Sequence, residues 1–518
     1  MDSKSVQIMI SMVVYMAAVI GIGLAYMKKA NKSTDAYLLG GRSLGPWVTA
    51  MSAEASDMSG WLLMGLPGVA YWCGLADAAW TAIGLAVGTY LNWLITSRRL
   101  RSYSVVANDS ITLPDFFSNR FRENKKIIMT VSALFIIVFF TIYASSCFVT
   151  CGKLFSTLFG LEYQTAMILG VIFVLAYTLL GGFLAESASD FMQSIVMIFA
   201  LTVIMVLGVV HAGGIGAVAE NAKSIPGFLE FFGIATPVTE NGVQQIINGQ
   251  PQFGEAGKYS LLSVASCMAW GLGYFGMPQV LLRFMAIRDG AELKRSRRIA
   301  TVWVVIAMAA AIFIGLIGRT VFPDALTTSS DSENIFILMS ESFLPPLLAG
   351  LVMAGILASV ISSSDSYLLI AASALSKNIF APAKKNADDK QVLWATRITL
   401  LLVAIVGAIL ASDENNQVIF TIVSFAWAGF GATFGPLMIF SLFWKRINRW
   451  GALAGMVSGG AMVFIWKLLL KPMGGVFGIY ELLPAFIVSC IFIVVVSLLT
   501  AAPSKEIQDD FEKAKANA

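Results

Sequence analysis

Long apolar stretches recur from one end of this chain to the other, and they constrain its fold more than any other feature. Residues 7–27, 127–150 and 481–501 each hold about 20 residues with at most one charge. About 20 apolar residues cross the hydrocarbon core of a bilayer as an α-helix, whereas a membrane β-barrel shows alternating segments of about ten. Only 13% of the residues are charged, against about 25% in soluble domains. The sequence therefore predicts an all-α integral membrane protein.

Thirteen apolar segments can be counted along the chain. The expected spans lie near residues 7–27, 44–72, 75–96, 127–150, 162–182, 189–213, 259–282, 299–319, 346–376, 392–412, 417–443, 450–470 and 481–501. The first run has no basic segment before it and no clear cleavage site after it, so we predict a span and not a signal peptide. Residues 1–501 are thus expected to form one transmembrane domain, followed by a polar tail at 502–518.

The basic residues predict an orientation. An odd number of spans places the two termini on opposite sides of the membrane. If the N-terminus is outside, the inner segments and the tail carry 28 of the 35 lysine and arginine residues, six of them in "RFMAIRDGAELKRSRR" (283–298). Basic residues gather on the cytoplasmic side of membrane proteins, so we expect the tail in the cytoplasm. The net charge of +4 reflects these segments and does not indicate a nucleic-acid partner.

Several kinds of chemistry are not expected from the residue content. The chain has one histidine, His211, no Walker A sequence, and five cysteines without a C-x-x-C pair. H-E-x-x-H zinc chemistry, ATP-driven pumping and a disulfide framework are therefore not predicted. We predict no enzyme activity, and nothing indicates an obligatory protein partner.

The second span contains "SAEASDMSGW" (52–61), with two acids, Glu54 and Asp57, inside an apolar run. An acid at the centre of a bilayer costs roughly 2.5–3.5 kcal/mol. Gly60, Gly65 and "LPG" (66–68) interrupt the helical pattern. A broken helix at membrane depth frees carbonyls for a cation and leaves a half-helix N-terminus for a substrate carboxylate. The alternative is that these small residues only allow close helix packing.

The ninth span contains "GILASVISSSDSYLL", in which Ser359, Ser362, Ser363 and Ser366 follow the helical spacing i, i+3, i+4, i+7. Asp365 lies beside this stripe. Hydroxyls and carbonyls supply the oxygen ligands that a hard cation prefers. Alternatively, the serines bond back to their own helix or bridge two helices.

The sixth span opens with "GGFLAESASDFMQS", in which Ser187, Asp190 and Ser194 share a helical face and Glu186 precedes them. Ionisable residues inside spans indicate function by default. Both acids are near the inner end of the expected span, so an interfacial position is the alternative.

The seventh span contains "WGLGYFGMPQVLLRFM", in which Trp270, Tyr274 and Pro278 recur at i, i+4, i+8 on one side. Aromatic rings beside a glycine-thinned backbone favour a small pocket for a partly apolar ligand, although such rings also serve packing or an interfacial belt. The second and seventh spans are both interrupted by glycine, lie five spans apart and run in opposite directions. We therefore predict a 5+5 inverted repeat, with spans 2–6 (about 44–213) as one unit and spans 7–11 (about 259–443) as the other.

Four stretches closely resemble the sodium/solute symporter family, and within it the bacterial sodium/proline symporters. They are "GGRSLGPWVTAMSAEASDMSGWLLMGLPG" (40–68), "LPDFF" (113–117), "WGLGYFGMPQVLLRFMA" (270–286) and "SFAWAGFGATFGP" (424–436). The resemblance covers nearly the whole chain. It implies the leucine-transporter-like fold, a place in the lipid bilayer of the bacterial cell (inner) membrane, and sodium-coupled L-proline uptake by alternating access.

The resemblance also implies roles for particular residues. Sodium would be held by the carbonyls of Ala55, Met58 and Ser359 and by the hydroxyls of Ser362 and Ser363. An acid important for sodium use matches Asp57. A second cation site of some members matches Asp190, Asp365 and Ser366. Proline recognition would fall to Ser59, Gly60, Trp61, Tyr143, Trp270, Tyr274 and Pro278. Arg42 and Glu333 match further functionally sensitive positions, Glu333 in the outer gate.

Three residues depart from the family pattern. Glu54 stands where a small residue is usual, Ser363 where many proline members have threonine, and Asp365 where serine is common. The extra acids leave open how many cations are coupled and whether a proton replaces or joins sodium. A transporter with the same mechanism could carry betaine, pantothenate or a sugar, although a sugar site should need more polar groups along the seventh span. A membrane sensor on a transporter fold is the alternative from another class, but the tail has only about 17 residues.

Overall fold

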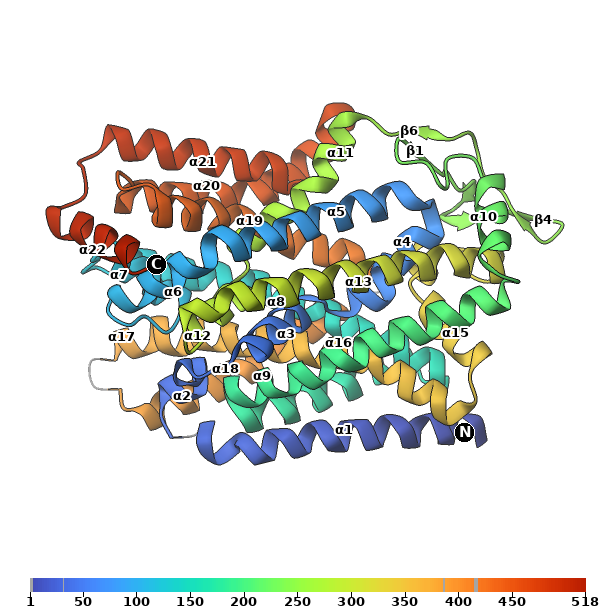
Figure 1. Ribbon diagram of the computed structural model, residues 1–518, viewed down its shortest axis with the longest axis horizontal. Coiled ribbons are helices and arrows are strands. Elements are labelled where there is room, and N and C mark those ends of the chain that lie inside the picture. Colours follow the sequence, from blue (N-terminus) through green and yellow to red (C-terminus); the bar gives the residue numbers. More distant parts are fainter. Residues whose placement is uncertain (1–2, 31, 385–386, 414–417) are drawn as a thin grey trace.

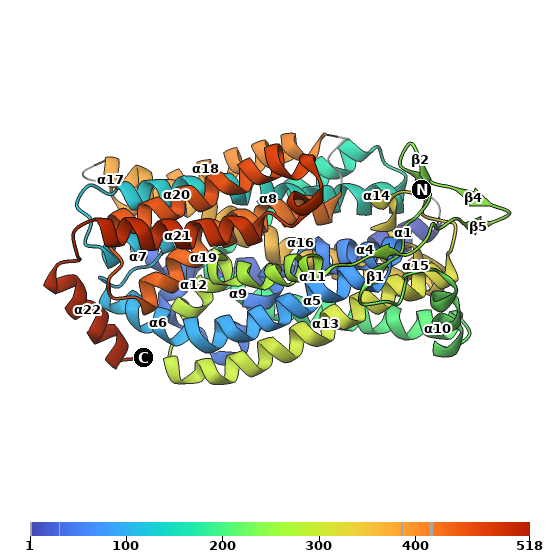
Figure 2. The ribbon, with the colours of Figure 1, turned by 90° about the horizontal axis from the view of Figure 1, so that it is seen from above.

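The computed structural model describes residues 3–30, 32–384, 387–413 and 418–518, and most of them are helical. The long helices run side by side along one axis and form an elongated bundle (Figures 1 and 2). Within the described residues, ten helices are long and apolar enough to cross a membrane, and a further pair bent by 43° makes eleven. The N-terminal end of α1 and the C-terminal helix α22 lie at opposite ends of the bundle (Figure 1).

The first half of the chain forms the elements up to α10. They are α1 (Ser3–Ala30), α2 (Thr34–Leu39), η1 (Gly40–Arg42), α3 (Pro46–Asp57), η2 (Trp61–Gly65), α4 (Leu66–Cys73), α5 (Leu75–Leu91), η3 (Asn92–Thr96), α6 (Ser97–Val106), α7 (Leu113–Arg120), α8 (Ile127–Phe159), α9 (Tyr163–His211) and α10 (Ile215–Ser224).

The second half begins with three short antiparallel strand pairs and continues with helices. The strand pairs are β1 (Gly233–Ile234) with β6 (Gly257–Lys258), β2 (Thr239–Glu240) with β3 (Val243–Gln244), and β4 (Ile246–Ile247) with β5 (Gln250–Pro251). The helices are α11 (Leu261–Met268), η4 (Ala269–Gly276), α12 (Pro278–Ala286), η5 (Gly290–Glu292), α13 (Leu293–Val321), α14 (Ser329–Ser332), α15 (Ile335–Phe343), α16 (Pro346–Leu375), η6 (Ser376–Phe380), α17 (Ala381–Ala383), α18 (Asp389–Ala411), α19 (Ile419–Phe443), α20 (Arg449–Ile465), η8 (Trp466–Leu470), η9 (Lys471–Met473), η10 (Gly475–Gly478), α21 (Leu482–Leu499) and α22 (Lys505–Ala516).

Each of the thirteen expected segments falls largely on helix, but the second, fifth, sixth and seventh are divided differently from a plain span. The second segment is α3, a break, and the shorter run η2–α4. The fifth and sixth segments are two parts of α9, which Gly182 divides with a positive φ of 57°. A Cβ at Gly182 would lie 2.8–3.0 Å from atoms of Tyr37, so the break also permits close packing. The expected eleventh span begins at residue 417, which lies outside the described residues.

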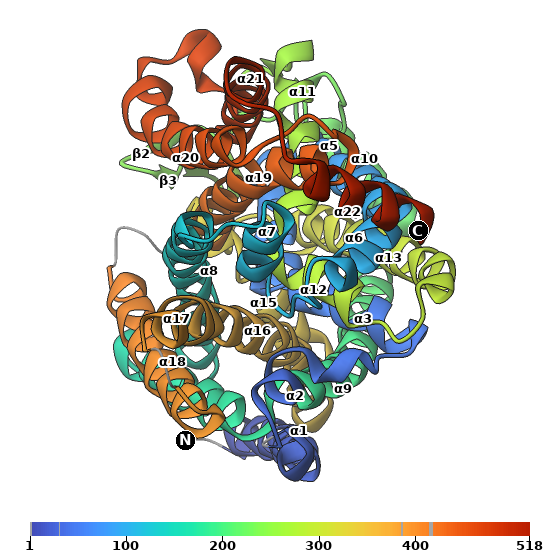
Figure 3. The same cartoon turned by 90° about the vertical axis from the view of Figure 1, so that its left-hand side faces the viewer.

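The helices differ in how deeply they are buried. The view along the bundle shows α16 near the centre, whereas α1, α18, α20 and α21 lie at the rim (Figure 3). In α21 the residues Ile487, Ile491, Val495 and Leu498 are exposed at helical spacing. Such an apolar outer stripe suits contact with lipid, because hydrocarbon needs no polar partner. The polar side chains of α16 therefore lie in the interior, where they contact protein.

Candidate ion and substrate site

The expected break in the second span is confirmed. The helix α3 ends at Asp57, and Met58 leaves the helical region with φ −85° and ψ 72°. The helix resumes after Gly60, where a Cβ would lie only 2.2 Å from Oγ1 of Thr150 on α8. All residues from Thr49 to Pro67 are buried, so the irregular backbone lies inside the protein, as it must at membrane depth.

The serine stripe of α16 meets the end of α3. Ser362 Oγ donates a hydrogen bond to the Ala55 carbonyl at 2.8 Å, and Ser363 Oγ donates to the same carbonyl at 3.4 Å. Ser362 Oγ also donates to the Ser359 carbonyl at 3.2 Å. Four of the five predicted sodium ligands therefore contact one another, and Met58 lies three residues beyond Ala55 at the break. Some serines also hydrogen-bond to their own helix, which was the alternative role for the serine stripe. The hydroxyls of Ser359 and Ser364 donate to backbone carbonyls within α16.

Asp57 connects the first broken segment to the second. Its Oδ2 accepts a hydrogen bond from Tyr274 Oη at 2.8 Å, and its Oδ1 accepts one from Gln279 Nε2 at 3.4 Å. Tyr274 lies in η4 and Gln279 in α12, on either side of the bend at Met277. The side chain of Asp57 is completely buried. The carboxyl group of Asp57 thus contacts residues on both sides of the bend in the seventh segment.

The seventh segment corrects one expectation. The i, i+4, i+8 spacing of Trp270, Tyr274 and Pro278 assumed a continuous α-helix, and this assumption is wrong. Residues 269–276 form a 3₁₀-helix, Met277 is extended, and Pro278 begins a new helix. The neighbouring glycines explain the difference, because a Cβ at Gly271 would lie 2.1 Å from the Gly84 carbonyl oxygen.

An aromatic cluster surrounds Trp270. Its ring centroid lies 6.2 Å from that of Trp61, 5.2 Å from Phe420 and 5.0 Å from Tyr480. The Trp427 indole donates to the Trp270 carbonyl at 2.8 Å. A cavity of about 400 Å³ reaches Trp270, Phe420 and Tyr480, and this size is typical of small-molecule sites. Trp270 lines this cavity, whereas Trp61 contacts the Trp270 ring and is not part of the cavity lining.

Three buried hydroxyls beside the break retain hydrogen-bonding capacity. Ser59 Oγ, Tyr143 Oη and Tyr367 Oη make no hydrogen bond of ordinary geometry among the described residues, although the side chain of Tyr143 interacts with those of Ser59 and Tyr367. The rings of Tyr143 and Tyr367 stack with centroids 4.2 Å apart. Because a buried polar group without a partner is costly, these hydroxyls are suited to contact a polar ligand.

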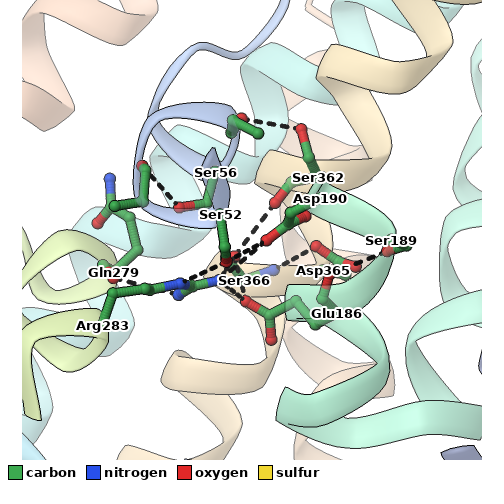
Figure 4. A network of polar contacts seen from close by, with 12 residues as sticks. Ser52, Ser56, Glu186, Ser189, Asp190, Gln279, Arg283, Ser362, Asp365 and Ser366 are labelled. Carbon is green, nitrogen blue, oxygen red and sulfur yellow. Dashed lines mark hydrogen bonds and ion pairs between the residues drawn. The ribbon is translucent and has the colours of Figure 1, made fainter. Parts of the chain in front are cut away.

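The acids of the sixth span surround a residue that the sequence did not single out, Arg283 of α12 (Figure 4). The Arg283 guanidinium forms ion pairs with Glu186 and with Asp190, the latter at 3.2 Å. It also donates to Ser52 Oγ at 3.0 Å and to Ser366 Oγ at 2.9 Å. Glu186, Asp190 and Arg283 are all buried within the protein. Arg283 was also counted among the basic residues of an inner segment, but its side chain is buried in the protein and does not lie in an exposed loop.

Glu54 and Asp365 are buried acids with fewer contacts. Oε1 of Glu54 accepts a hydrogen bond from the Trp93 indole at 3.1 Å, and Oε2 has no partner among the described residues. Oδ1 of Asp365 accepts from the Ser366 backbone N–H at 2.8 Å, and Oδ2 has no partner there. Asp365 and Glu186 both line a small cavity of about 10 Å³.

Arg42 and Glu333 lie away from the breaks and join several elements. Arg42 donates to the carbonyls of Met285 and Ser110 at 2.6 and 2.9 Å. Glu333 forms a buried ion pair with Lys153 at 2.6 Å and accepts hydrogen bonds from the backbone N–H groups of residues 419 and 420. Its carboxylate thus caps the N-terminus of α19, where a negative charge is favoured.

Sequence reasoning missed the cationic and amide partners of the predicted acids. Arg283, Gln279, Lys153 and Trp93 each contact an acid that the sequence had identified. The sequence did contain a signal for Arg283, because this basic residue stands inside the otherwise apolar run "VLLRFMA" (280–286). A charged residue in such a run indicates a buried partner. The long sequence separations of these pairs explain why the pattern could not assign partners.

The fold and these polar breaks define a class of protein. Two interrupted helices that meet in the interior of an all-helical membrane bundle are typical of secondary transporters. The family model "Sodium:solute symporter family" matches residues 37–459. The chain belongs to this family.

Individual relatives agree with the family match. The chain is 40% identical over 503 residues to the "Osmoregulated proline transporter OpuE" of Bacillus subtilis, covering 97% of this chain and 96% of the relative. It is 39% identical to "Sodium/proline symporter 2" of Staphylococcus saprophyticus, covering 98% and 96%. In structure it is similar to a Na+-coupled sialic acid symporter in a substrate-bound outward-open state, with a TM-score of 0.75, 16% identity, and coverage of 96% and 99%. The structural likeness supports the leucine-transporter-like fold.

Proposed function

We propose that this protein couples the downhill entry of sodium to the uptake of L-proline by alternating access. The observation that carries the proposal is the meeting of the α3 break with the α16 serines, where Ser362 contacts the Ala55 carbonyl at 2.8 Å. The similarity to proline transporters over almost the whole chain supports L-proline as the substrate.

Sodium would bind between α3 and α16. The carbonyls of Ala55, Met58 and Ser359 and the hydroxyls of Ser362 and Ser363 form a neutral oxygen donor set, which fits a hard cation. Asp57 lies two residues from Ala55 and adds a negative charge beside this set. In this proposal Asp57 strengthens the attraction for sodium without serving as a ligand.

Proline would bind beside the same break. The half-helix that resumes at Trp61 offers its N-terminus to the substrate carboxylate, as broken helices do in transporters. The rings of Trp61, Trp270 and Tyr274 would contact the pyrrolidine ring. The hydroxyls of Ser59 and Tyr143 would bind its polar groups, and Gly60 and Pro278 would shape the backbone on the two sides.

The proposed topology has thirteen crossings. Spans 2–6 and 7–11 would form the two inverted units, and α1, α20 and α21 would be additions to them. The N-terminus would be outside the cell and α22 in the cytoplasm, within a bacterial inner membrane. The placement of the two termini at opposite ends of the bundle supports an odd number of crossings (Figure 1), and the orientation rests on the distribution of lysine and arginine. In this topology Glu333 would belong to the outer gate.

The energy available supports uphill uptake of a small solute. One charge that crosses about 100 mV contributes about 2.3 kcal/mol, and a tenfold sodium gradient adds about 1.4 kcal/mol. Together these terms could maintain a proline gradient of roughly several hundredfold.

Proton coupling is a second candidate, and Glu54 is the observation that favours it. Its carboxyl group is completely buried, and its Oε2 has no hydrogen-bond partner among the described residues. A buried carboxylate without a cation is unfavourable, so a proton on Glu54 would lower the cost of its position.

Uptake of labelled proline into proteoliposomes tests both candidates. An inward sodium gradient should drive accumulation, and a proton gradient without sodium should not. Proline uptake that ignores sodium would contradict sodium coupling, and no uptake under either gradient would contradict the substrate. Trp270→Ala should raise the proline concentration for half-maximal uptake more than the sodium concentration, whereas the reverse would move the substrate site elsewhere.

A further inference from the structure

The outer face of the segment α5–η3–α6 changes from apolar to basic within one helical turn. Val87, Leu91 and Leu94 are exposed at helical spacing. The next two side chains on the same line are Arg98 and Arg101. Apolar side chains suit the hydrocarbon of a bilayer, and basic side chains suit the level of its headgroups. Position 98 therefore marks the level at which this segment leaves the hydrocarbon.

The neighbouring helix α13 shows the same change at the same end of the bundle. The helices α5 and α13 lie side by side (Figures 1 and 2). Along α13, Arg295 and Arg298 are exposed, and Val302 and Ile306 continue the same line as exposed apolar side chains. The two helices thus share a surface that is apolar along most of its length and basic at one end.

Two exposed aromatic rings lie at this boundary. The guanidinium carbon of Arg295 lies 5.7 Å from the centroid of the Trp47 ring on α3, and that of Arg297 lies 5.2 Å from the centroid of the Tyr90 ring on α5. Trp47 and Tyr90 are 48% and 42% exposed. Tryptophan and tyrosine gather at the interface between hydrocarbon and headgroups. The rings and the charges therefore indicate the same level of the bilayer.

A cavity of about 510 Å³ opens at this basic end, between α6, the segment around η5, and the end of α22. Arg98, Arg101 and Arg288 line it. Arg101 Nε donates a hydrogen bond to the Ile287 carbonyl at 2.8 Å, which ties this guanidinium to the cavity wall. The cavity thus receives three guanidinium groups from two separate parts of the chain.

The acids near the cavity leave two of these arginines without an ion pair. Glu292 pairs with Arg288 at 2.8 Å, and Asp289 Oδ1 accepts a hydrogen bond from a backbone N–H of η5 at 2.9 Å. Arg98 and Arg101 form no ion pair within the part of the chain that the structure describes. Three arginines beside two acids leave a net positive charge that an external anion could balance.

We propose that this surface binds an anionic phospholipid, with its phosphate at Arg98 and Arg101 and its acyl chains along the exposed apolar faces of α5 and α13. Guanidinium groups bind phosphate oxygens through paired hydrogen bonds. The adjoining apolar surface suits acyl chains and has no role for a free phosphate ion. A choline headgroup would bring its own positive charge next to the arginines, so a headgroup with a net negative charge fits better. The inference goes beyond proline uptake and does not depend on the transported solute.

Lipid retention by the purified full-length protein in detergent tests the inference. After removal of bound lipid, the protein receives equal amounts of dioleoyl phosphatidylglycerol and dioleoyl phosphatidylcholine, which differ only in their headgroups. Native mass spectrometry then counts the lipid that remains bound. The wild type should retain roughly tenfold more phosphatidylglycerol than phosphatidylcholine, and the double variant Arg98→Gln with Arg101→Gln should lose this preference.

The matched control is Lys384→Gln with Lys390→Gln. It also removes two exposed positive charges at the same end of the bundle, beside α17 and in α18 (Figure 1), and it should keep the preference. Thermal unfolding gives an independent measurement, because a ligand of the native state stabilises that state. Phosphatidylglycerol should raise the unfolding midpoint of the wild type more than phosphatidylcholine does, and this difference should vanish in the double variant.

Three results would overturn the inference. Equal retention of the two lipids by the wild type would do so even if the double variant does not fold. A folded double variant that keeps the preference would exclude Arg98 and Arg101 as the phosphate ligands. Displacement of phosphatidylglycerol by millimolar inorganic phosphate would show a site for small anions in place of a lipid site.

Discussion

At the scale of single residues, the buried acids fall into two groups. Some form ion pairs with a basic side chain, and others contact only neutral hydrogen-bond donors. Arg283 pairs with Glu186 and Asp190, and Lys153 pairs with Glu333. Asp57 instead accepts hydrogen bonds from neutral donors, Tyr274 and Gln279. Its carboxyl group has no basic partner in these contacts, and the proposed function gives it the role of attracting a cation beside Ala55, so this difference gives a test.

Asp57→Asn should weaken sodium binding sharply. Asparagine can still accept a hydrogen bond from Tyr274, so the change removes the charge and keeps most of the packing. We expect the sodium concentration for half-maximal binding to rise roughly tenfold or more, which is about 1.4 kcal/mol. Tyr274→Phe is the matched control, because it removes the hydrogen bond and keeps the charge, and it should affect sodium less. Unchanged sodium binding in Asp57→Asn would contradict the role of this acid.

The acids were predictable from the sequence, but their partners were not. Asp57, Asp190 and Asp365 stand out because each is an expensive residue in an apolar run. Arg283 was grouped with the basic loop that follows α12. The sequence pattern does not show that α12 extends to Ala286 and that the Arg283 side chain is buried in it. The contact between Arg283 and Glu186 spans 97 residues, and only the packing of α12 against α9 and α16 brings the two together.

At the scale of elements, the two breaks have different local structures. In the second span, α3 ends cleanly and the chain resumes as η2 after a short irregular stretch. In the seventh segment, a 3₁₀-helix precedes the bend. Glycine and proline indicated both positions in the sequence. The 3₁₀ form could not be read there, because it follows from the close approach of η4 to α5 and α19, which depends on the tertiary fold.

Gly60→Ala should disturb the first break. The added Cβ would lie 2.2 Å from Thr150 Oγ1 and 2.7 Å from its Cγ2, so α8 or the break must shift. We expect a loss of about 1–3 kcal/mol in the free energy of unfolding and weaker proline binding. Gly21→Ala is the control, because a Cβ there meets nothing within 4 Å, and it should be neutral. Thermal unfolding in detergent and proline binding would measure both effects, and a Gly60→Ala protein with unchanged stability and binding would show that the contact relaxes freely.

At the scale of the whole molecule, buried polar contacts join helices that are distant in sequence. The general architecture could be predicted from hydropathy, charge asymmetry and glycine placement, because each follows from the bilayer as solvent. The buried contacts that join distant helices could not, since they depend on pairs such as Lys153 and Glu333. This pair connects α8, the end of α14 and the start of α19.

Lys153→Met should destabilise the bundle, because it leaves the Glu333 carboxylate buried without its cation. Removing one partner of a buried ion pair typically costs about 3–5 kcal/mol. The double variant Lys153→Met with Glu333→Gln should recover much of this loss, since no charge then remains unpaired. Thermal unfolding of the two single variants and the double variant forms the necessary cycle. Additive losses would mean that the pair contributes no coupling to the bundle.

The contact between Ser362 and Ala55 has a consequence for the return half of the transport cycle. The hydroxyl and the carbonyl that are proposed as ion ligands hydrogen-bond each other across α16 and α3. Helices that satisfy each other's polar groups in this way do not need an ion between them to remain in contact within a low-dielectric interior. A transporter with this contact can return to its starting conformation without a bound ion or substrate at little cost in free energy. Net accumulation of the substrate is then possible without the export of a second substrate.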